Sequence, residues 1–398
     1  MNSTPQNYNY YKEIFKNKQM PFAFVDMDLF NKNIKDIIKR ADGKKIRIAS
    51  KSIRCVDLIK KILASDPIFQ GVMCYHPLEA IYLSENGLDN LLIAYPVFHE
   101  RQIVALCNEI KKGKLIIVMA DLPEHAEQLN RIAEKENCIL PVCMDIDLSG
   151  DYGSLHFGVR RSNITTTAKA LELFSRIKKL KNIRLDGVMG YEAQIAGVGD
   201  LTDNSIKNFI ISVLKKKSIK EISKQRAEIV NAIQAQGYQL KFVNGGGTGS
   251  IETTIKEPCI TEVAVGSGFY SPGLFDSYNN FHHLPAAAYA IEITRHPLDD
   301  IYTCAGGGYT ASGSMEPNKL PKPYLPEGAK LIETEGAGEV QTPIIYKGNE
   351  KLNLGDPIFM RHAKAGELCE RFNSLYLVSD GKIIDEVKTY RGEGKCFL

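Results

Sequence analysis

A lysine that follows a predicted strand is the first residue in the chain that could do chemistry. Residues 45–49 have the β-branched content of a short buried strand, and Lys51 comes two positions later. A neutral amine at the end of a buried strand can form a Schiff base with a carbonyl compound. A lone lysine in this position is usually only a solvated loop cation, so the assignment of Lys51 depends on which other residues the fold brings beside it.

Glycine-rich stretches follow two other predicted strands. In residues 243–250 (VNGGGTGS), consecutive glycines allow backbone amides to face an anion, and the following residues add hydroxyl groups. The small residues of segment 265–273 (VGSGFYSPG) offer a second set of amides. Each stretch alone is also consistent with a tight turn, but together they predict a phosphate site. Its predicted residues are Asn244, Gly245, Gly246, Gly247, Thr248, Gly266, Ser267 and Tyr270.

Short apolar runs alternate with amphipathic segments, such as residues 99–112 and 122–136, which have helical spacing. The predicted strands lie at residues 45–49, 68–74, 90–95, 114–120, 139–147, 183–190, 240–244 and 261–265. This alternation implies a parallel sheet, and eight such units predict a closed (β/α)8 barrel. An open doubly wound sheet is the competing architecture. It usually carries its glycine loop after the first strand, whereas here the loop follows the seventh.

The composition changes near residue 280, where glycine and proline become frequent. Short β-type segments then replace the alternation, at residues 290–294, 344–346, 358–360 and 375–378. We therefore predict an α/β protein in two parts. An N-terminal segment and the barrel occupy residues 1–280, and a mainly-β domain occupies residues 281–398.

Charge and composition exclude several classes of protein. The 398 residues carry 50 Lys and Arg against 47 Asp and Glu, so nucleic acid is not an expected partner. No apolar run is long enough to cross a membrane, and the polar N-terminus lacks the apolar core of a secretory signal. The nine cysteines are scattered without CxxC spacing. We therefore expect reduced thiols and a cytoplasmic protein.

The order of these features resembles the alanine racemase-like family of pyridoxal-phosphate barrels, from residues 21–34 to residues 362–373. Within that family it is most similar to the branch of D-threonine aldolases, D-serine dehydratases and related amino-acid deaminases/aldolases. The resemblance implies that Lys51 binds the aldehyde of pyridoxal 5'-phosphate and that the two glycine loops hold its phosphate. The cofactor then acts as an electron sink for an amino-acid substrate. The resemblance also implies a homodimer, because relatives place each site between two subunits.

Two further segments concern the cofactor ring. Residues 146–163 occupy the place of a family loop that usually carries an arginine beside the ring, and His156 stands at its position. Arg160 or Arg161 then supplies the lost charge or binds the substrate carboxylate, unless both are solvated surface residues. Tyr191 is expected near the ring, where it can stack or donate a proton.

Segment 362–373 (HAKAGELCERFN) concerns the reaction itself. In this branch a His-x-Cys or His-x-Asp pair binds a divalent metal such as Mn, Mg or Zn, which polarises the substrate β-hydroxyl. His362 matches the histidine, but Lys364 stands where the second ligand belongs, and an ammonium cannot bind a cation. Either Cys369 or Glu367 replaces that ligand, or Lys364 itself supplies the positive charge. Without a metal, His362 can act as general base at the hydroxyl.

We therefore expect a pyridoxal-phosphate-dependent lyase that acts on a β-hydroxy D-amino acid through Lys51, His362 and Tyr191. Retro-aldol cleavage and dehydration differ in one bond and need the same residues, so the sequence does not separate them. An amino-acid racemase is the alternative enzyme, and it needs a second acid–base group such as Tyr309. A non-enzymatic carrier of pyridoxal phosphate is the third alternative. The residues after 280 argue against a carrier, because known carriers are single barrels.

Overall fold

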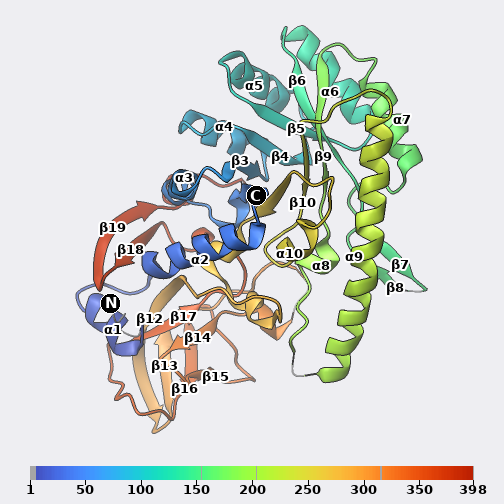
Figure 1. Ribbon diagram of the computed structural model, residues 1–398. Helices are drawn as coiled ribbons and strands as arrows, with labels where there is room; N and C mark the ends of the chain where they lie inside the picture. Colours follow the sequence, from blue (N-terminus) through green and yellow to red (C-terminus); the bar gives the residue numbers. More distant parts are fainter. Residues whose placement is uncertain (1–5, 154, 203, 314–315, 398) are drawn as a thin grey trace.

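The computed structural model describes residues 6–153, 155–202, 204–313 and 316–397. Its larger part is a closed barrel of eight parallel strands in the order β10-β11-β2-β3-β4-β5-β6-β9 (Figure 1). The strands are β2 (Lys45–Ala49), β3 (Phe69–Cys74), β4 (Leu91–Pro96), β5 (Ile116–Ala120), β6 (Leu140–Asp145), β9 (Ile183–Gly190), β10 (Phe242–Gly245) and β11 (Glu262–Val265). Each coincides with a strand predicted from the sequence. The predicted barrel is therefore confirmed, and the open sheet is excluded.

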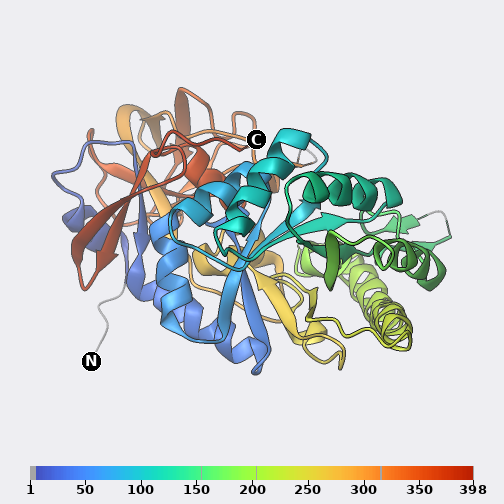
Figure 2. The ribbon, with the colours of Figure 1, turned by 90° about the horizontal axis from the view of Figure 1, so that it is seen from above.

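Amphipathic helices cover the outside of the barrel, as the view from above shows (Figure 2). The longer helices are α2 (Met27–Ala41), α3 (Val56–Ser65), α4 (Pro77–Glu85), α5 (Glu100–Lys111), α6 (Pro123–Lys135), α7 (Thr167–Ile177) and α9 (Ser205–Gln234). The short helices α8 (Ala193–Ala196), α10 (Ile251–Thr254) and α11 (Ser267–Tyr270) follow β9, β10 and β11. No helix in the described ranges is long and apolar enough to cross a membrane.

Side chains alternate across each barrel strand, because successive residues of a strand face opposite sides. On β2, Ile46 and Ile48 are fully buried in the core beneath the helices. Arg47 lies between them, and its Nε donates to Oε1 of Glu262 on β11 at 2.8 Å. The apolar interior of the barrel consists of Leu92, Ala94, Ile117, Met119, Cys143, Met189 and Phe242. Its packing requires Gly187, because a Cβ there would overlap the Phe242 ring.

A second, nine-stranded sheet lies beside the barrel and is mostly antiparallel. Its main order is β15-β16-β13-β12-β1-β18-β19, and β17 pairs with both β12 and β14. The strands are β1 (Phe22–Asp26), β12 (Ala287–Leu298), β13 (Ile301–Ala305), β14 (Lys322–Leu325), β15 (Lys330–Leu331), β16 (Gln341–Ile345), β17 (Pro357–Arg361), β18 (Ser374–Ser379) and β19 (Lys382–Lys388). The predicted mainly-β C-terminal part is therefore confirmed.

The N-terminal segment contributes to this second sheet. After helix α1 (Tyr8–Ile14), strand β1 pairs antiparallel with β12 and parallel with β18. Helix α2 then leads from β1 to the first barrel strand. The two parts of the fold are thus connected at both ends of the barrel sequence. The domain limits given above stay a prediction, since the second sheet takes strands from both sides of the barrel.

Candidate active site

A cavity of about 1740 Å³ lies at the carboxyl ends of the barrel strands. Every barrel strand places a residue there, at its end or just after it: Lys51, Tyr75, Tyr95, Asp121, Asp145, Tyr191, Gly246 and Gly266. The second sheet contributes Ser312, Lys319 and Lys364 from its loops. The cavity is therefore shared between the barrel and the second sheet, at the end of the barrel where enzymes of this architecture place their sites.

Lys51 lies on η1 (Ser50–Ser52), a short 3-10 turn that follows β2. Its side chain is exposed and lines the cavity, whereas its backbone is held in place. The Nε of Arg54 donates to the Lys51 carbonyl at 2.9 Å, and Arg54 Nη1 pairs with Glu370 at 2.5 Å. Gly366, at φ +61°, packs on the same carbonyl, and a Cβ there would overlap its oxygen. The Lys51 amine thus extends from a fixed backbone into the cavity.

The two glycine loops meet beside Lys51, because β11 pairs with both β2 and β10. The Gly268 amide donates to Thr248 Oγ1 at 3.1 Å, and Ser52 Oγ lies 3.2 Å from Ser267 Oγ. Within the described ranges, the backbone amides of Thr248 and Ser267 donate to no protein acceptor, although both residues line the cavity. Free amides, hydroxyls and a lysine amine in one cavity fit a phosphorylated aldehyde such as pyridoxal phosphate.

Other predicted cofactor residues take different positions around this cavity. Asn244 lines it and donates through Nδ2 to Glu262 Oε1 at 2.9 Å. Tyr191 lines it beside Gly247, where a Cβ would come within 3.2 Å of the tyrosine ring. Burial raises the pKa of Tyr191 to about 12, so its phenol is protonated at neutral pH and can donate. Gly245 is buried in β10 and is not among the lining residues.

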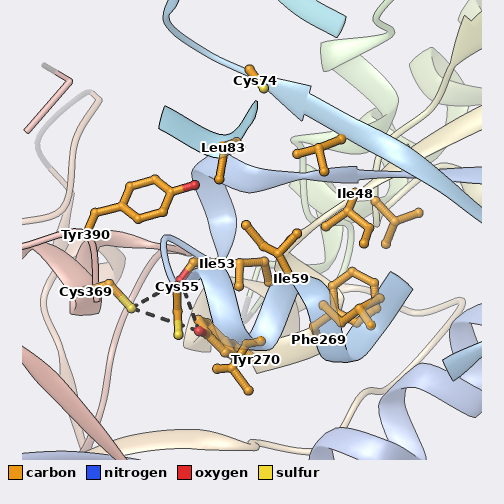
Figure 3. Close-up of a cluster of buried hydrophobic side chains, with 14 of the residues drawn as sticks. Ile48, Ile53, Cys55, Ile59, Cys74, Leu83, Phe269, Tyr270, Cys369 and Tyr390 are labelled. Carbon is orange, nitrogen blue, oxygen red and sulfur yellow. Dashed lines mark hydrogen bonds between the residues drawn. The ribbon is translucent and has the colours of Figure 1, made fainter. Parts of the chain in front are cut away.

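Tyr270, His362 and Cys369 are fully buried and do not line the cavity. Figure 3 shows Tyr270 and Cys369 converging on Ile53: the Tyr270 hydroxyl donates to the Ile53 carbonyl at 3.0 Å, and Cys369 Sγ at 3.3 Å. The His362 ring is fully buried, with its centroid 6.2 Å from that of Tyr270. Burial, together with the charge of Arg361, lowers the pKa of His362 to about 3, so the ring is neutral.

These positions do not fit the metal site predicted from His362 and Cys369. The Cys369 thiol is bound to a backbone carbonyl, and burial raises its pKa, which disfavours the thiolate that a metal needs. Glu367, the other predicted substitute, accepts from the Ser312 amide at 3.0 Å. Among the residues that the structure describes, no three His, Cys, Asp or Glu side chains are grouped so as to hold a metal ion.

A hairpin of β7 (Gly150–Tyr152) and β8 (Leu155–Phe157) carries the predicted ring-side residues. His156 lines the cavity, and its Nδ1 lies 2.7 Å from Asp151 Oδ1. Arg161 also lines the cavity. Arg160, which we predicted beside the cofactor, is exposed and is not among the lining residues. Of the two arginines left open by the sequence, Arg161 is therefore the one that lines the cavity.

The sequence did not point to an acidic group on the side of the cavity formed by β5 and β6. Asp121, Asp145 and Asp147 all line the cavity. Burial, together with Asp121 and Asp147, raises the pKa of Asp145 to about 8, an effect that Arg161 opposes. Asp121 and Asp145 each follow an apolar run directly, as Lys51 nearly does. That shared position at a strand end was the signal available in the sequence.

Lys364 is one of five lysines that line the cavity, and it approaches from the second sheet. Its Nζ donates to the carbonyl of Ser312 at 3.1 Å and to its hydroxyl at 2.9 Å. Burial lowers the pKa of Lys364. The negative charge of Glu367 opposes this effect, and the positive charges of Lys319, Lys51 and Arg161 add to it. A lowered pKa makes the ammonium group a stronger acid, so Lys364 gives up its proton more readily than a free lysine. Lys364 therefore offers acid–base chemistry as well as charge.

Known proteins share parts of this sequence. Among curated proteins, the chain is similar to 3-hydroxy-D-aspartate aldolase from Paracoccus denitrificans, with 24% identity over 251 residues, or 63% of this chain and 59% of that protein. It is also similar to D-threonine aldolase from Arthrobacter sp, with 19% identity over 255 residues, or 64% and 61% of the two chains. The chain thus spans about three fifths of the length of these relatives.

Solved structures share the whole fold. D-threonine aldolase from Filomicrobium marinum superimposes with a TM-score of 0.78 at 17% identity, covering 94% of this chain and 95% of the other. D-threo-3-hydroxyaspartate dehydratase from Delftia sp. HT23 gives 0.75 at 15% identity, covering 94% and 98%. The family described as alanine racemase, N-terminal domain, matches residues 25–272, from β1 to the loop after β11. Because this match covers more than half of the sequence, the chain belongs to the alanine racemase N-terminal domain family.

Proposed function

We propose that this protein is a pyridoxal-phosphate-dependent lyase that acts on a β-hydroxy D-amino acid. The observation that carries the proposal is the position of the Lys51 amine beside the free amides of Thr248 and Ser267, on neighbouring strands of one cavity. The relatives named as aldolases and as a dehydratase of hydroxy D-amino acids support the class of reaction.

Different residues of the cavity would hold different groups of the cofactor. Lys51 would bind its aldehyde, and the amides of Thr248 and Ser267 would hold its phosphate, with the hydroxyl of Ser52 beside them. Tyr191 would donate a hydrogen bond from its neutral phenol. When bound, pyridoxal phosphate supplies an electron sink for the bond that breaks at the substrate α-carbon.

The substrate needs a cation for its carboxylate and an acid–base group at its β-hydroxyl. We assign the carboxylate to Arg161, whose guanidinium matches it in shape and charge. We assign the hydroxyl to Lys364. In retro-aldol cleavage, Lys364 accepts the hydroxyl proton as the Cα–Cβ bond breaks and an aldehyde leaves. In dehydration, Lys51 takes the α-proton and Lys364 protonates the departing hydroxyl, which leaves as water.

His362, the base expected from the sequence, stays a prediction. Its ring is fully buried and does not line the cavity, so Lys364 is better placed to reach a substrate hydroxyl. The residues of the second sheet in the cavity favour an enzyme over a single-barrel carrier of the cofactor. Tyr309, the candidate second group of a racemase, is not among the lining residues. The homodimer also stays a prediction.

Product analysis tests the proposal directly. The purified protein is incubated with pyridoxal phosphate and with D-threonine, D-serine, D-threo-3-hydroxyaspartate and their L-enantiomers. Glycine and an aldehyde identify an aldolase, a 2-oxo acid and ammonia identify a dehydratase, and the opposite enantiomer identifies a racemase. We expect one of the first two outcomes, from D-substrates only. A protein that gives no visible absorbance with the cofactor and no product would refute the proposal.

A further inference from the structure

A buried carboxylate lies beneath the first glycine loop. Glu192, the residue after Tyr191, is 2% exposed, and its Oε2 accepts from the backbone amide of Gly246 at 3.0 Å. Its Oε1 accepts from the hydroxyl of Ser250 at 3.1 Å and from the hydroxyl of Thr254. Three donors from the loop and the short helix that follows it thus bind one side chain at the end of β9. Glu192 fixes the glycine loop to the neighbouring strand.

Arg226 of α9 compensates the charge of Glu192. Its side chain is fully buried, and its Nη2 donates to Glu192 Oε2 and to the Gly190 carbonyl, both at 3.0 Å. Its Nη1 pairs with Glu257, after α10. A buried carboxylate is stable in its ionised form only with such partners. One buried ion group therefore joins the long helix, the end of β9 and the glycine loop.

This arrangement divides the amides of the loop into two sets. The amides of Gly246 and Gly247 are used inside the protein, toward Glu192 and toward Ser250 Oγ at 3.0 Å. The next amide, that of Thr248, has no acceptor among the described residues, and Thr248 lines the cavity. The Gly247 carbonyl shares a planar peptide unit with the Thr248 amide and accepts from the Ser250 amide at 3.0 Å, which sets the direction of the Thr248 N–H. The inward hydrogen bonds therefore set which amide is left for a ligand.

We propose that Glu192, held by Arg226, is a positioning residue for the phosphate of the cofactor. It keeps the glycine loop in the conformation in which the Thr248 amide is available to an anion. Neither Glu192 nor Arg226 lines the cavity, so neither touches the ligand. The inference rests on the proposed function, since it takes pyridoxal phosphate as the ligand. It adds a residue whose effect is confined to the phosphate group.

The experiment compares two ligands of the apo protein. Pyridoxal phosphate and pyridoxal share the ring and the aldehyde, and only the first carries the phosphate. The ratio of their dissociation constants, measured by absorbance titration, isolates the contribution of the phosphate. In Glu192→Ala we expect this ratio to fall by about tenfold or more, the effect of losing a hydrogen bond to a charged group. Pyridoxal itself should bind as it does to the wild type.

Matched variants separate positioning from general stability. Glu192→Gln keeps an oxygen for the Gly246 amide, and the hydroxyls of Ser250 and Thr254 can turn to accept from its NH2 group. Glu192→Gln should therefore restore most of the wild-type ratio of dissociation constants. Asp186→Asn is the control in the middle of β9, where a carboxylate that is 1% exposed pairs with Arg184 at 2.6 Å and Lys241 at 2.9 Å. It should lower the melting temperature and leave the ratio unchanged.

The binding measurements separate a failure of this inference from a failure of the proposed function. If Glu192→Ala weakens both ligands equally, or leaves the ratio at the wild-type value, the inference is wrong. A wild type that binds both ligands equally well would also overturn it. A wild type that binds neither would instead refute the proposed function. If Glu192→Ala does not fold, Ser250→Ala takes its place, because Ser250 Oγ bridges Glu192 and the Gly247 amide. An unchanged ratio in that variant would count against the inference in the same way.

Discussion

Replacing Asp145 with asparagine is expected to stabilise this protein at neutral pH. Burial, with the negative charges of Asp121 and Asp147, raises the pKa of Asp145 from 3.8 to about 8. Between these two values the folded protein keeps a proton on this carboxyl that the unfolded chain releases. Stability is therefore lost as the pH rises from 3.8 to about 8, and stays reduced above that. Asparagine is neutral in both states and avoids this loss.

The size of the effect follows from the two pKa values. A pH of 7 is 3.2 units above the ordinary pKa of 3.8. At 1.36 kcal/mol per unit, the loss in the free energy of unfolding at pH 7 is therefore at most about 4 kcal/mol. The cavity is open to water, which screens these charges, so we halve this to about 2 kcal/mol. Unfolding entropy is about 2.1 cal/mol/K per residue, or about 0.8 kcal/mol/K for 398 residues. Asp145→Asn should therefore raise the Tm at pH 7 by about 2–3 °C.

Thermal unfolding measured from pH 4 to pH 9 checks this reasoning. The Tm values of the wild type and Asp145→Asn should nearly coincide at pH 4, diverge up to about pH 8 and then stay a constant distance apart. Asp89→Asn is the control, because Asp89 is exposed, accepts from the Leu115 amide at 2.8 Å and does not contribute to the shift of Asp145, so this change should not raise the Tm. An Asp145→Asn protein that is less stable than the wild type at pH 8, or a difference that is independent of pH, would refute the argument.

Three further predictions concern the proposed activity. Lys51→Ala should abolish the visible absorbance that the protein gives with pyridoxal phosphate, whereas Lys45→Ala, at the exposed other end of β2, should leave it unchanged. Lys364→Met should lower kcat by about a hundredfold or more, and Lys364→Arg, which keeps the charge but does not titrate near neutral pH, should not restore it. A restored kcat would show that charge alone is required. A chelator should leave activity unchanged, because the donors around His362 do not fit a metal; activity that is lost and then recovered with Mn²⁺ or Zn²⁺ would contradict this.

The barrel and the two glycine loops could be predicted because their signals are local. Each barrel strand is a short apolar run next to an amphipathic helix, and the phosphate loops need glycine for reasons that a single segment reveals. The position of β1 could not be predicted in this way. Its sequence reads as a buried strand, but its partners β12 and β18 lie far along the chain, and only the folded sheet identifies them.

The residues after β17 are a second case, within the site, in which the sequence alone could not predict the position of side chains. His362 and Lys364 are two positions apart, yet only Lys364 lines the cavity. Gly366 turns the chain in a left-handed conformation against the Lys51 carbonyl, and Cys369 then points into the core toward Ile53. This turn and its contact with the barrel determine which side chains of the segment face the cavity. A motif match at His362 carries no information about either.

The charge of Arg161 acts on the pKa of the Asp145 carboxyl, and this predicts a proton uptake on substrate binding. Its positive charge lowers the pKa of both Asp145 and Lys364. A substrate carboxylate paired with Arg161 would offset that charge, so the pKa of Asp145, which is about 8, would rise and its carboxyl would bind more proton. Calorimetric titration near pH 8 with the unreactive analogue 3-hydroxybutyrate, in buffers of different ionisation enthalpy, should therefore detect proton uptake. Arg161→Met should lose most of it, since no charge remains to be offset. Binding without proton exchange in the wild type would place the carboxylate elsewhere in the cavity.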